Sequence, residues 1–362
     1  MPTVAGQLEV ARANRSAAQA LWAAPPAIEV GNRGEPFAST AGQRETEFGL
    51  AWPLLLPGQR AARGASSQAD LSTADASQDA ARLRIAGQVR ESAWVVLLRR
   101  AELAIAEAHS KDLDALTADV ERRVGAGDLA RADALAARSE FLSAQSAATG
   151  GRQQLDAARA RWVLLTGTSA VPDGIEAQID AALIAVEDHP EMSLARLKTE
   201  SARKRLDLVR ATRSDPPELF VRYRNDVPAH NVASQSTIGL AIRIPFATTD
   251  RNRPREASAI AEVDVASAEE RRTRERLVSE ISSAAAAAAA SELRLATEDS
   301  RAALLRERAR LIDKSFRAGE TALPELLRAL AAALQAEGSL ARQRAELGLS
   351  RALVQQAAGR IP

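Results

Sequence analysis

The sequence predicts a mainly α-helical protein with a small antiparallel β part. Alanine is abundant, aromatic residues make up only 3% of the 362 residues, and nearly all the cations are arginine. Such a composition is typical of long helices that pack closely through small side chains. The chain also repeats itself at a spacing of 192 residues, and each repeat holds two short segments of alternating apolar and polar residues. These features indicate two helical repeats, each with a pair of strands.

The overall composition excludes several classes of protein. The chain is 46% hydrophobic and 26% charged, with 48 Lys and Arg residues against 47 Asp and Glu residues, which argues against disorder and against bulk attraction to nucleic acid. It contains no cysteine, so disulfides, thiolate catalysis and Cys-ligated metals are excluded. No stretch reaches the roughly 20 apolar residues that a membrane-spanning helix needs.

Two sets of landmarks define the repeat. Pro53 and Pro245 each follow an alternating segment and each precede an Arg-x-Ala sequence by ten residues, and they are 192 residues apart. Gly127 and Gly319 stand in the matching stretches "AGDLARADAL" and "AGETALPELL", and they are also 192 residues apart. Two separate landmarks with one spacing argue against chance similarity between alanine-rich helices.

Each repeat is therefore expected to run through a short helix, two strands, a proline, a very long helix, a glycine turn and a second long helix. At about 1.5 Å per residue, the first long helix of each repeat would be about 100 Å long. We place repeat 1 at residues 1–181 and repeat 2 at 182–362, and we expect them to form one interwoven structural unit. The expected strands are 27–34, 44–54, 218–226 and 235–246, and the expected long helices are 58–123, 128–165, 250–316 and 321–356.

The alternating segments have one apolar face and one polar or small face. In "TEFGLAW", Phe48 and Trp52 share a face, and in "TIGLAIRIP" Leu240 and Ile242 oppose Gly239. An ordinary antiparallel sheet with one face on a core would explain each hairpin. Apolar-out, polar-in strands also suit a membrane barrel, and because four strands are too few to close one alone, that barrel would be shared among copies of the chain.

The ordered set of motifs resembles the TolC-like outer-membrane efflux factors, most closely their heavy-metal (cobalt-zinc-cadmium, CzcC-like) branch. The resemblance is carried by the twofold repeat, by "DRNRPREASAIAE" after Pro245 and by the turn "RAGETALPELL". It implies a homotrimer with a twelve-stranded outer-membrane barrel and a helical barrel in the periplasm. The trimer would be the passive exit duct of a tripartite pump, with a periplasmic adaptor (membrane fusion protein), an inner-membrane RND transporter and outer-membrane lipid as partners. It implies no cofactor and no nucleic acid.

The resemblance also assigns roles to particular residues. It makes the glycine turns the tips that meet the adaptor, although turn chemistry alone would explain them: the glycines permit a tight reversal, and the acid after each suits a helix N-terminus. The implied tip residues are Gly125, Gly127, Asp128, Leu129, Gly319, Glu320, Thr321 and Leu323.

A carboxylate ring narrows the pore of TolC-like channels, six and nine residues after the second turn glycine. Glu325 matches the first of these positions, and Asp133 is its equivalent in repeat 1, but the second position is Arg328. Arg328 could pair with Glu325 of a neighbouring copy or face solvent.

The strand-to-helix segments would form the junction between membrane and periplasm. Proline ends a strand ladder because it lacks an N–H group, and arginine can pair with lipid phosphate. The arginines could equally be solvated residues at helix starts. The implied junction residues are Pro53, Arg60, Arg63, Pro245, Arg251, Arg253 and Arg255.

No enzyme motif is present. His109, His189 and His230 are scattered over a helix, a linker and a loop, and no HExxH, GxSxG or glycine-rich phosphate loop occurs. The alternative to a channel is a non-channel coiled-coil protein, either the periplasmic adaptor of such a pump or a soluble helical scaffold. Met1 is followed at once by helical sequence, without a visible signal peptide, so we expect the outer-membrane placement to apply to a longer parent chain.

Overall fold

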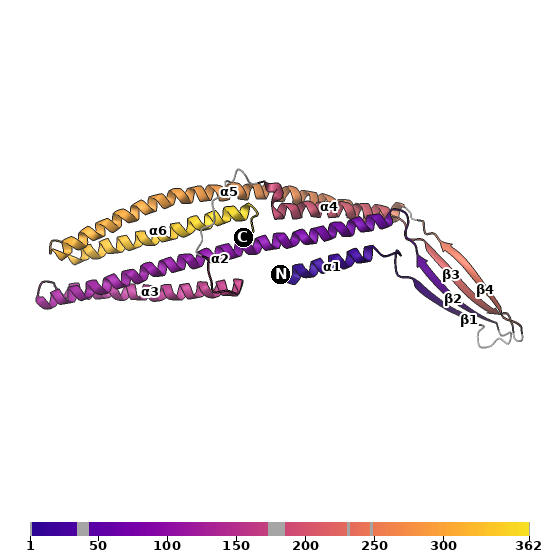
Figure 1. Ribbon diagram of the computed structural model, residues 1–362, viewed down its shortest axis with the longest axis horizontal. Coiled ribbons are helices and arrows are strands. Elements are labelled where there is room, and N and C mark those ends of the chain that lie inside the picture. Colours follow the sequence, from indigo (N-terminus) through magenta and orange to yellow (C-terminus); the bar gives the residue numbers. More distant parts are fainter. Residues whose placement is uncertain (1, 35–42, 173–184, 230–231, 247–248, 362) are drawn as a thin grey trace. The chain divides into compact units, whose positions relative to one another are not determined.

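The computed structural model describes residues 2–34, 43–172, 185–229, 232–246 and 249–361, and it is mainly helical with one small sheet (Figure 1). His230 and the expected repeat boundary at 181/182 lie outside these residues. The strands are β1 (Ala27–Gly34), β2 (Arg44–Pro53), β3 (Glu218–Val227) and β4 (Gln235–Arg243). The helices are α1 (Pro2–Ala18), α2 (Gln59–Ala126), α3 (Arg131–Thr166), the short 3-10 helix η2 (Val186–Asp188), α4 (Pro190–Ala211), α5 (Thr249–Arg317) and α6 (Leu323–Ala357).

The chain forms two compact units, and neither unit is a repeat. Unit 1 comprises Met1–Ala81 and Pro190–Arg274, and unit 2 comprises Arg82–His189 and Glu275–Pro362. Each unit therefore takes residues from both halves of the sequence. The two longest helices, α2 and α5, each begin in unit 1 and end in unit 2.

The sheet of unit 1 is antiparallel, with the strand order β1-β2-β3-β4 (Figure 1). Its register brings the apolar residues into rows across all four strands. Ile28, Leu50, Val221 and Leu240 form one such row, and the neighbouring row is formed by Val30, Phe48, Tyr223 and Ile238. Most of these apolar side chains are exposed. The apolar face of the sheet is thus left uncovered by the residues that the structure describes.

The opposite face of the sheet carries charges that pair across strands. Glu45 on β2 lies 3.0 Å from Arg224 on β3, and Arg222 on β3 lies 3.9 Å from Glu29 on β1. Near the other end of the sheet, Arg243 on β4 lies 3.7 Å from Glu218. Cross-strand pairs of opposite charge favour this register over a slip by one residue, which would put charges on the apolar face.

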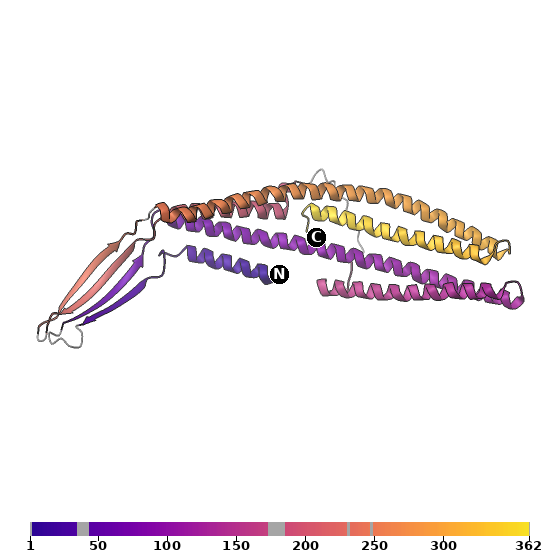
Figure 2. The same ribbon diagram turned by 180° about the vertical axis from the view of Figure 1, so that it is seen from behind.

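The four helical segments of unit 2 pack as two antiparallel pairs, α2 with α3 and α5 with α6, as both views show (Figures 1 and 2). Near the turns they share a core of Val120, Ala137, Phe316, Leu323 and Leu326. Alanines at the contact positions, such as Ala137, let the helices approach closely.

Candidate functional site

The turns between the paired helices have the same backbone construction in both halves. Gly127 and Gly319 have φ angles of 87° and 80°, which is left-handed backbone that favours glycine. The N–H group of Asp128 donates to Arg123 O at 2.9 Å, and that of Glu320 donates to Ser315 O at 3.0 Å. These are Schellman-type closures of α2 and α5. Residues 192 apart therefore occupy the same place in the two turns.

The residues assigned to the tips divide into exposed and buried groups. Gly125, Gly127, Asp128, Gly319 and Glu320 are exposed, and Leu129 and Thr321 are half-buried. Thr321 Oγ1 lies 2.6 Å from Ser315 Oγ, so its hydroxyl helps to hold the turn. Leu323 is only 1% exposed and belongs to the core cluster near the turns. Its side chain supports the turn from inside and is not part of the tip surface.

The acids assigned to the constriction occupy equivalent backbone positions with different partners. Asp133 and Glu325 are each the third residue of their helix. Asp133 Oδ2 accepts the N–H of Ala130 at 3.2 Å and so caps the start of α3. The carboxylate of Glu325 instead forms ion pairs with two arginines: Oε1 lies 3.1 Å from Nη2 of Arg308 on α5, and Oε2 lies 3.2 Å from Nη2 of Arg328. Arg328 thus pairs with Glu325 of its own chain.

Arg308 was not singled out by the sequence, yet it is the residue that ties Glu325 to the next helix. It belongs to α5, 17 residues before Glu325, and arginines are frequent along that helix. The corresponding position of repeat 1 is Leu116, so the two halves of the chain differ here. A comparison of the two repeats shows this difference between Arg308 and Leu116 in the sequence, but only the fold shows that Arg308 contacts Glu325.

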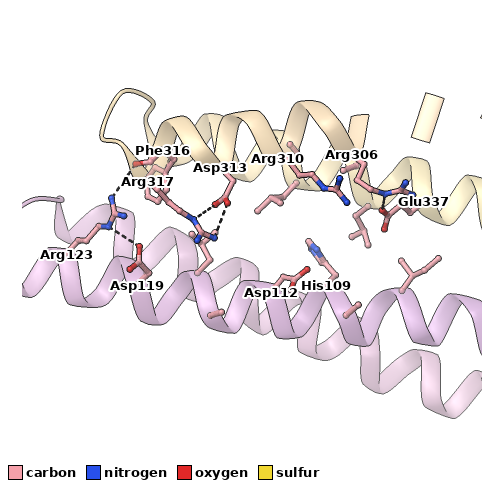
Figure 3. Close-up of a pocket in the computed structure, with 18 of the residues that line it drawn as sticks. His109, Asp112, Asp119, Arg123, Arg306, Arg310, Asp313, Phe316, Arg317 and Glu337 are labelled. Carbon is pink, nitrogen blue, oxygen red and sulfur yellow. Dashed lines mark hydrogen bonds and ion pairs between the residues drawn. The ribbon is translucent and has the colours of Figure 1, made fainter. Parts of the chain in front are cut away.

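A cavity of about 670 Å³ lies near the turns, between α2 on one side and α5 and α6 on the other (Figure 3). Charged side chains of both signs line it, and many of them pair. Arg123 Nε lies 2.9 Å from Asp119 Oδ2 and its guanidinium lies 5.2 Å from the ring centre of Phe316. Arg306 Nε donates to Glu337 Oε1 at 2.8 Å.

His109 of α2 points into this cavity, beside Asp112 (Figure 3). Burial lowers the pKa of His109 below its ordinary value of 6.5, and the carboxylates of Asp112, Glu140 and Glu337 oppose that shift. The neutral imidazole is therefore favoured despite three acidic neighbours.

The first of the two segments assigned to the junction, which contains Pro53, Arg60 and Arg63, is hydrogen-bonded to the turn that follows α1. Pro53 is the last residue of β2, and its carbonyl accepts the N–H of Ala23 at 3.1 Å. Arg60 donates to Gln19 O at 3.2 Å and Arg63 to Ala23 O at 3.0 Å. These two arginines are thus engaged by backbone carbonyls of the turn after α1.

The second junction is built from different side chains. β4 ends at Arg243, two residues before Pro245. Arg251 pairs with Asp215 at 3.3 Å, and Arg253 and Arg255 are exposed. Asn252, 192 residues after Arg60, donates to Arg213 O at 2.9 Å, so it also binds a backbone carbonyl that follows the preceding short helix.

Two further junction residues were missed by sequence reasoning. Glu256 accepts hydrogen bonds from Arg210 at 2.9 Å and Arg213 at 3.0 Å, and the bond from Arg210 is the main reason that its pKa lies below the ordinary value. Gln59 is buried and donates to Ala211 O of α4 at 3.2 Å. Their partners are 43 to 152 residues away in sequence, so no local motif marks them.

Two further properties bear on function. Within the described ranges, no group of three or more His, Cys, Asp or Glu side chains could hold a metal ion. The helices, as far as the structure describes them, include none that is long and apolar enough to cross a membrane.

Comparison with known proteins identifies relatives of both the sequence and the fold. Residues 1–168 match the model of the family described as outer membrane efflux protein. A comparison with curated protein sequences returned no match.

Several solved structures share the fold. The chain resembles the outer membrane protein VceC of Vibrio cholerae with a TM-score of 0.80 at 15% identity, over 99% of this chain and 92% of VceC. It resembles CusC, whose crystal structures concern folding and transmembrane channel formation, with a TM-score of 0.80 at 17% identity, over 99% and 88% of the two chains. For the open state of the Neisseria gonorrhoeae outer membrane channel MtrE, the TM-score is 0.77 at 15% identity, over 99% and 85%.

The mainly helical, TolC-like fold expected from the sequence is thereby confirmed over essentially the whole chain. The heavy-metal branch is not distinguished, because the identities to CusC and VceC are both low. The first 168 residues thus match the outer membrane efflux protein family, and the chain as a whole has the fold of solved outer membrane channels.

Proposed function

We propose that this protein is the exit duct of a tripartite RND-type efflux pump, that it works as a homotrimer, and that its cargo is heavy-metal cations. The observation that carries the proposal is the four-stranded sheet, whose apolar face is exposed and whose opposite face is charged. A sheet of this kind suits lipid on one side and water on the other. Its edge strands β1 and β4 each pair with a single described strand, so further copies would be needed to close a barrel.

The partners that we propose are a periplasmic adaptor at the turns and an inner-membrane RND transporter beyond it. Asp128 and Glu320 support this assignment because they are exposed acids directly after the turn glycines. Gly127 and Gly319 would be the points of closest approach for the adaptor.

The constriction of the duct would lie at Glu325, with Arg328 and Asp133. Glu325 is held by Arg308 and Arg328 within one chain, so each copy would present a partly neutralised acid. Pro53 and Pro245 would mark the boundary of the barrel. Arg253 and Arg255 are the junction arginines best placed to meet lipid phosphate, because both are exposed.

The heavy-metal cargo is supported by the stretch Pro245-Phe246 followed by Asp250-Arg251-Asn252, which resembles the corresponding motif of the CzcC-like branch. The cargo can be tested with a strain that lacks the gene, by measuring growth inhibition by zinc, cobalt and cadmium salts and by organic antibiotics. We expect the deletion to sensitise cells to the metals and the intact gene to restore resistance. Sensitivity to antibiotics alone would reject the metal assignment but leave the duct in place.

The docking role of the turns can be tested in the same strain. Gly127→Trp and Gly319→Trp should yield protein in the outer membrane but fail to restore resistance. Gly64→Trp provides a matched control, because Gly64 lies far from the turns on α2 and no heavy atom lies within 4 Å of an added Cβ. Resistance restored by the turn variants as well as by the control would refute the docking role.

A further inference from the structure

Two cavities adjoin each other between α2, α5 and α6 in unit 2. The first is the cavity of about 670 Å³ that holds His109. The second has a volume of about 540 Å³, and most of the side chains that line it are apolar. Ile105 and the ion pair of Arg306 with Glu337 line both cavities. A charged space and an apolar space are therefore joined at these three residues.

Small side chains explain why space remains between these helices. Ala101, Ala104 and Ala108 follow one another at intervals of three and four residues, so they share one face of α2. Each of them lines one of the two cavities, as do Ala341 and Ala345 of α6. A methyl group on each of the two facing helices leaves room between them for another molecule.

Contacts at both ends of the cavities hold the helices around this space. At one end, Arg90 Nη1 of α2 donates to Gln356 Oε1 of α6 at 2.8 Å. At the other end, the guanidinium of Arg123 of α2 lies 5.2 Å from the ring centre of Phe316 of α5. The cavities are thus part of the packed structure of one chain.

Most of the charged side chains of the first cavity pair with one another. Five arginines and four acidic residues line it. Its ion pairs are Arg122 with Asp119, Arg123 with Asp119, Arg306 with Glu337, and Arg317 with Asp313. The fifth arginine, Arg310, and the fourth acid, Asp112, form no ion pair with an acidic residue, arginine or lysine in the part of the chain that the structure describes.

These two unpaired charges lie on opposite walls of the cavity. Arg310 extends from α5 and Asp112 lies on α2, beside His109 (Figure 3). Both residues are exposed, so a molecule from solution can reach them. A guanidinium facing a carboxylate across a cavity is complementary to a head group that carries one charge of each sign.

The arrangement occurs in only one half of the repeat. The residue 192 positions before Arg310 is Ala118, and the residue 192 positions after Asp112 is Leu304. The packing that the two halves share therefore does not require these two charges.

We propose that the two cavities form a binding site for a small amphipathic zwitterion, an organic molecule with an apolar ring system and a head group that contains a carboxylate and an ammonium group. The carboxylate pairs with Arg310 and the ammonium group with Asp112, and the ring system extends past Ile105 into the second cavity. Ligand sites typically enclose roughly 300–1,000 Å³ and combine apolar walls with a few polar groups, and both volumes lie in this range. The site is complete within one chain, so the inference does not depend on the proposed duct.

Three probes that share one fluorescent ring system test the head group. Nε-dansyl-lysine carries both charges, dansylglycine only the carboxylate, and dansylcadaverine only the ammonium group. Their affinities can be measured by fluorescence titration of the full chain in a non-ionic detergent, with protein-free micelles as the blank. Dansyl-lysine should bind about tenfold more tightly than either of the others, because each charged contact contributes roughly one factor of ten.

Substitutions at the two unpaired charges should each affect a different pair of probes. Arg310→Gln should weaken dansyl-lysine and dansylglycine about tenfold and leave dansylcadaverine unchanged. Asp112→Asn should weaken dansyl-lysine and dansylcadaverine about tenfold and leave dansylglycine unchanged. Ala104→Phe should weaken all three probes, because its ring fills the second cavity. Ala104 is exposed at the edge of that cavity, so the larger side chain should not prevent folding.

Arg161→Gln is the matched control, because Arg161 is an exposed arginine of α3 that lines neither cavity. It should bind all three probes as the wild type does. Equal affinities of the wild type for the three probes would overturn the proposal, as would variants at Arg310 and Asp112 that bind like the control. Unchanged binding by Ala104→Phe would overturn it too. None of these results would bear on the proposed duct, because the titration requires neither a pump nor a membrane.

Discussion

The imidazole of His109 lies half-buried among charged side chains, and its surroundings favour the neutral form. Desolvation disfavours the charged imidazolium, and the nearby carboxylates of Asp112, Glu140 and Glu337 only partly offset it. The protonation state of His109 therefore depends on the burial that the fold imposes on its imidazole.

The stability of the protein should therefore fall as the pH is lowered below 6.5, the ordinary pKa of histidine. In that range the unfolded chain takes up a proton at His109 while the folded chain does not yet do so, which favours unfolding. His109→Gln removes this contribution, so its melting temperature should fall less than that of the wild type between about pH 7.5 and 5.5. Parallel melting profiles for the two proteins would contradict the lowered pKa.

Ile242 and Ala241 are neighbours on β4 that face opposite sides of the sheet. Ile242 lies in a row with Leu219 and Trp52, on the apolar face, and Ala241 is paired with Phe220 on the other face. Ile242→Asp should lower the amount of protein recovered in the outer membrane, because a charge on a lipid-facing side chain costs on the order of 1 kcal/mol near the membrane surface. Ala241→Asp should leave that amount unchanged. Equal recovery of the two variants would reject a membrane-facing apolar side.

At the scale of helices, the close contact between α2 and α6 requires a glycine at position 348 of α6. A Cβ atom at Gly348 would lie 2.0 Å from the ring of Trp94. At Gly338 in the same helix, the nearest heavy atom to an added Cβ is Arg342 Nη2, 3.9 Å away. Replacing Gly348 by alanine therefore tests the packing of α6 against Trp94, whereas the same replacement at Gly338 tests only the helix propensity.

Gly348→Ala should destabilise the protein by about 1–3 kcal/mol, the usual cost of overpacking. Gly338→Ala should stabilise it by about 0.5–1 kcal/mol, because alanine favours a helix over glycine. Chemical unfolding followed by circular dichroism measures both changes. If both variants moved in the same direction, the close approach of α6 to Trp94 would not be supported.

At the scale of the whole molecule, the link from α5 to α6 next to the turns should affect conduction. Glu325→Ala breaks the contacts of Glu325 with Arg308 and Arg328, so single-channel recordings in lipid bilayers should show a changed conductance or open time. Glu337→Ala is the matched control, because Glu337 also joins α6 to α5, through Arg306 at 2.8 Å, but lies 12 residues farther along α6. Recordings of Glu325→Ala that match both the wild type and the control would refute the proposed constriction at Glu325.

The sequence by itself determined the features that depend on neighbouring residues or on the repeat. Alternation in "TIGLAIRIP" and "TEFGLAW" marked two of the strands, and two glycines in matching contexts marked the turns. The 192-residue shift also placed Asp133 and Glu325 at the same position of their helices, which the structure shows. The strands and turns are local patterns, read from a period of 2 residues or from a turn of a few residues, and the repeat is read by comparing the sequence with itself.

Only the tertiary structure decided which helix each face meets. It put Leu323 in the core, paired Glu325 with Arg308, and placed His109 in a cavity beside Asp112. Helical periodicity identifies an apolar or charged face, but it carries no information about which distant segment covers that face. That choice follows from the packing of segments that lie far apart in the sequence, such as Arg123 and Phe316, which are 193 residues apart, and Arg90 and Gln356, which are 266 residues apart.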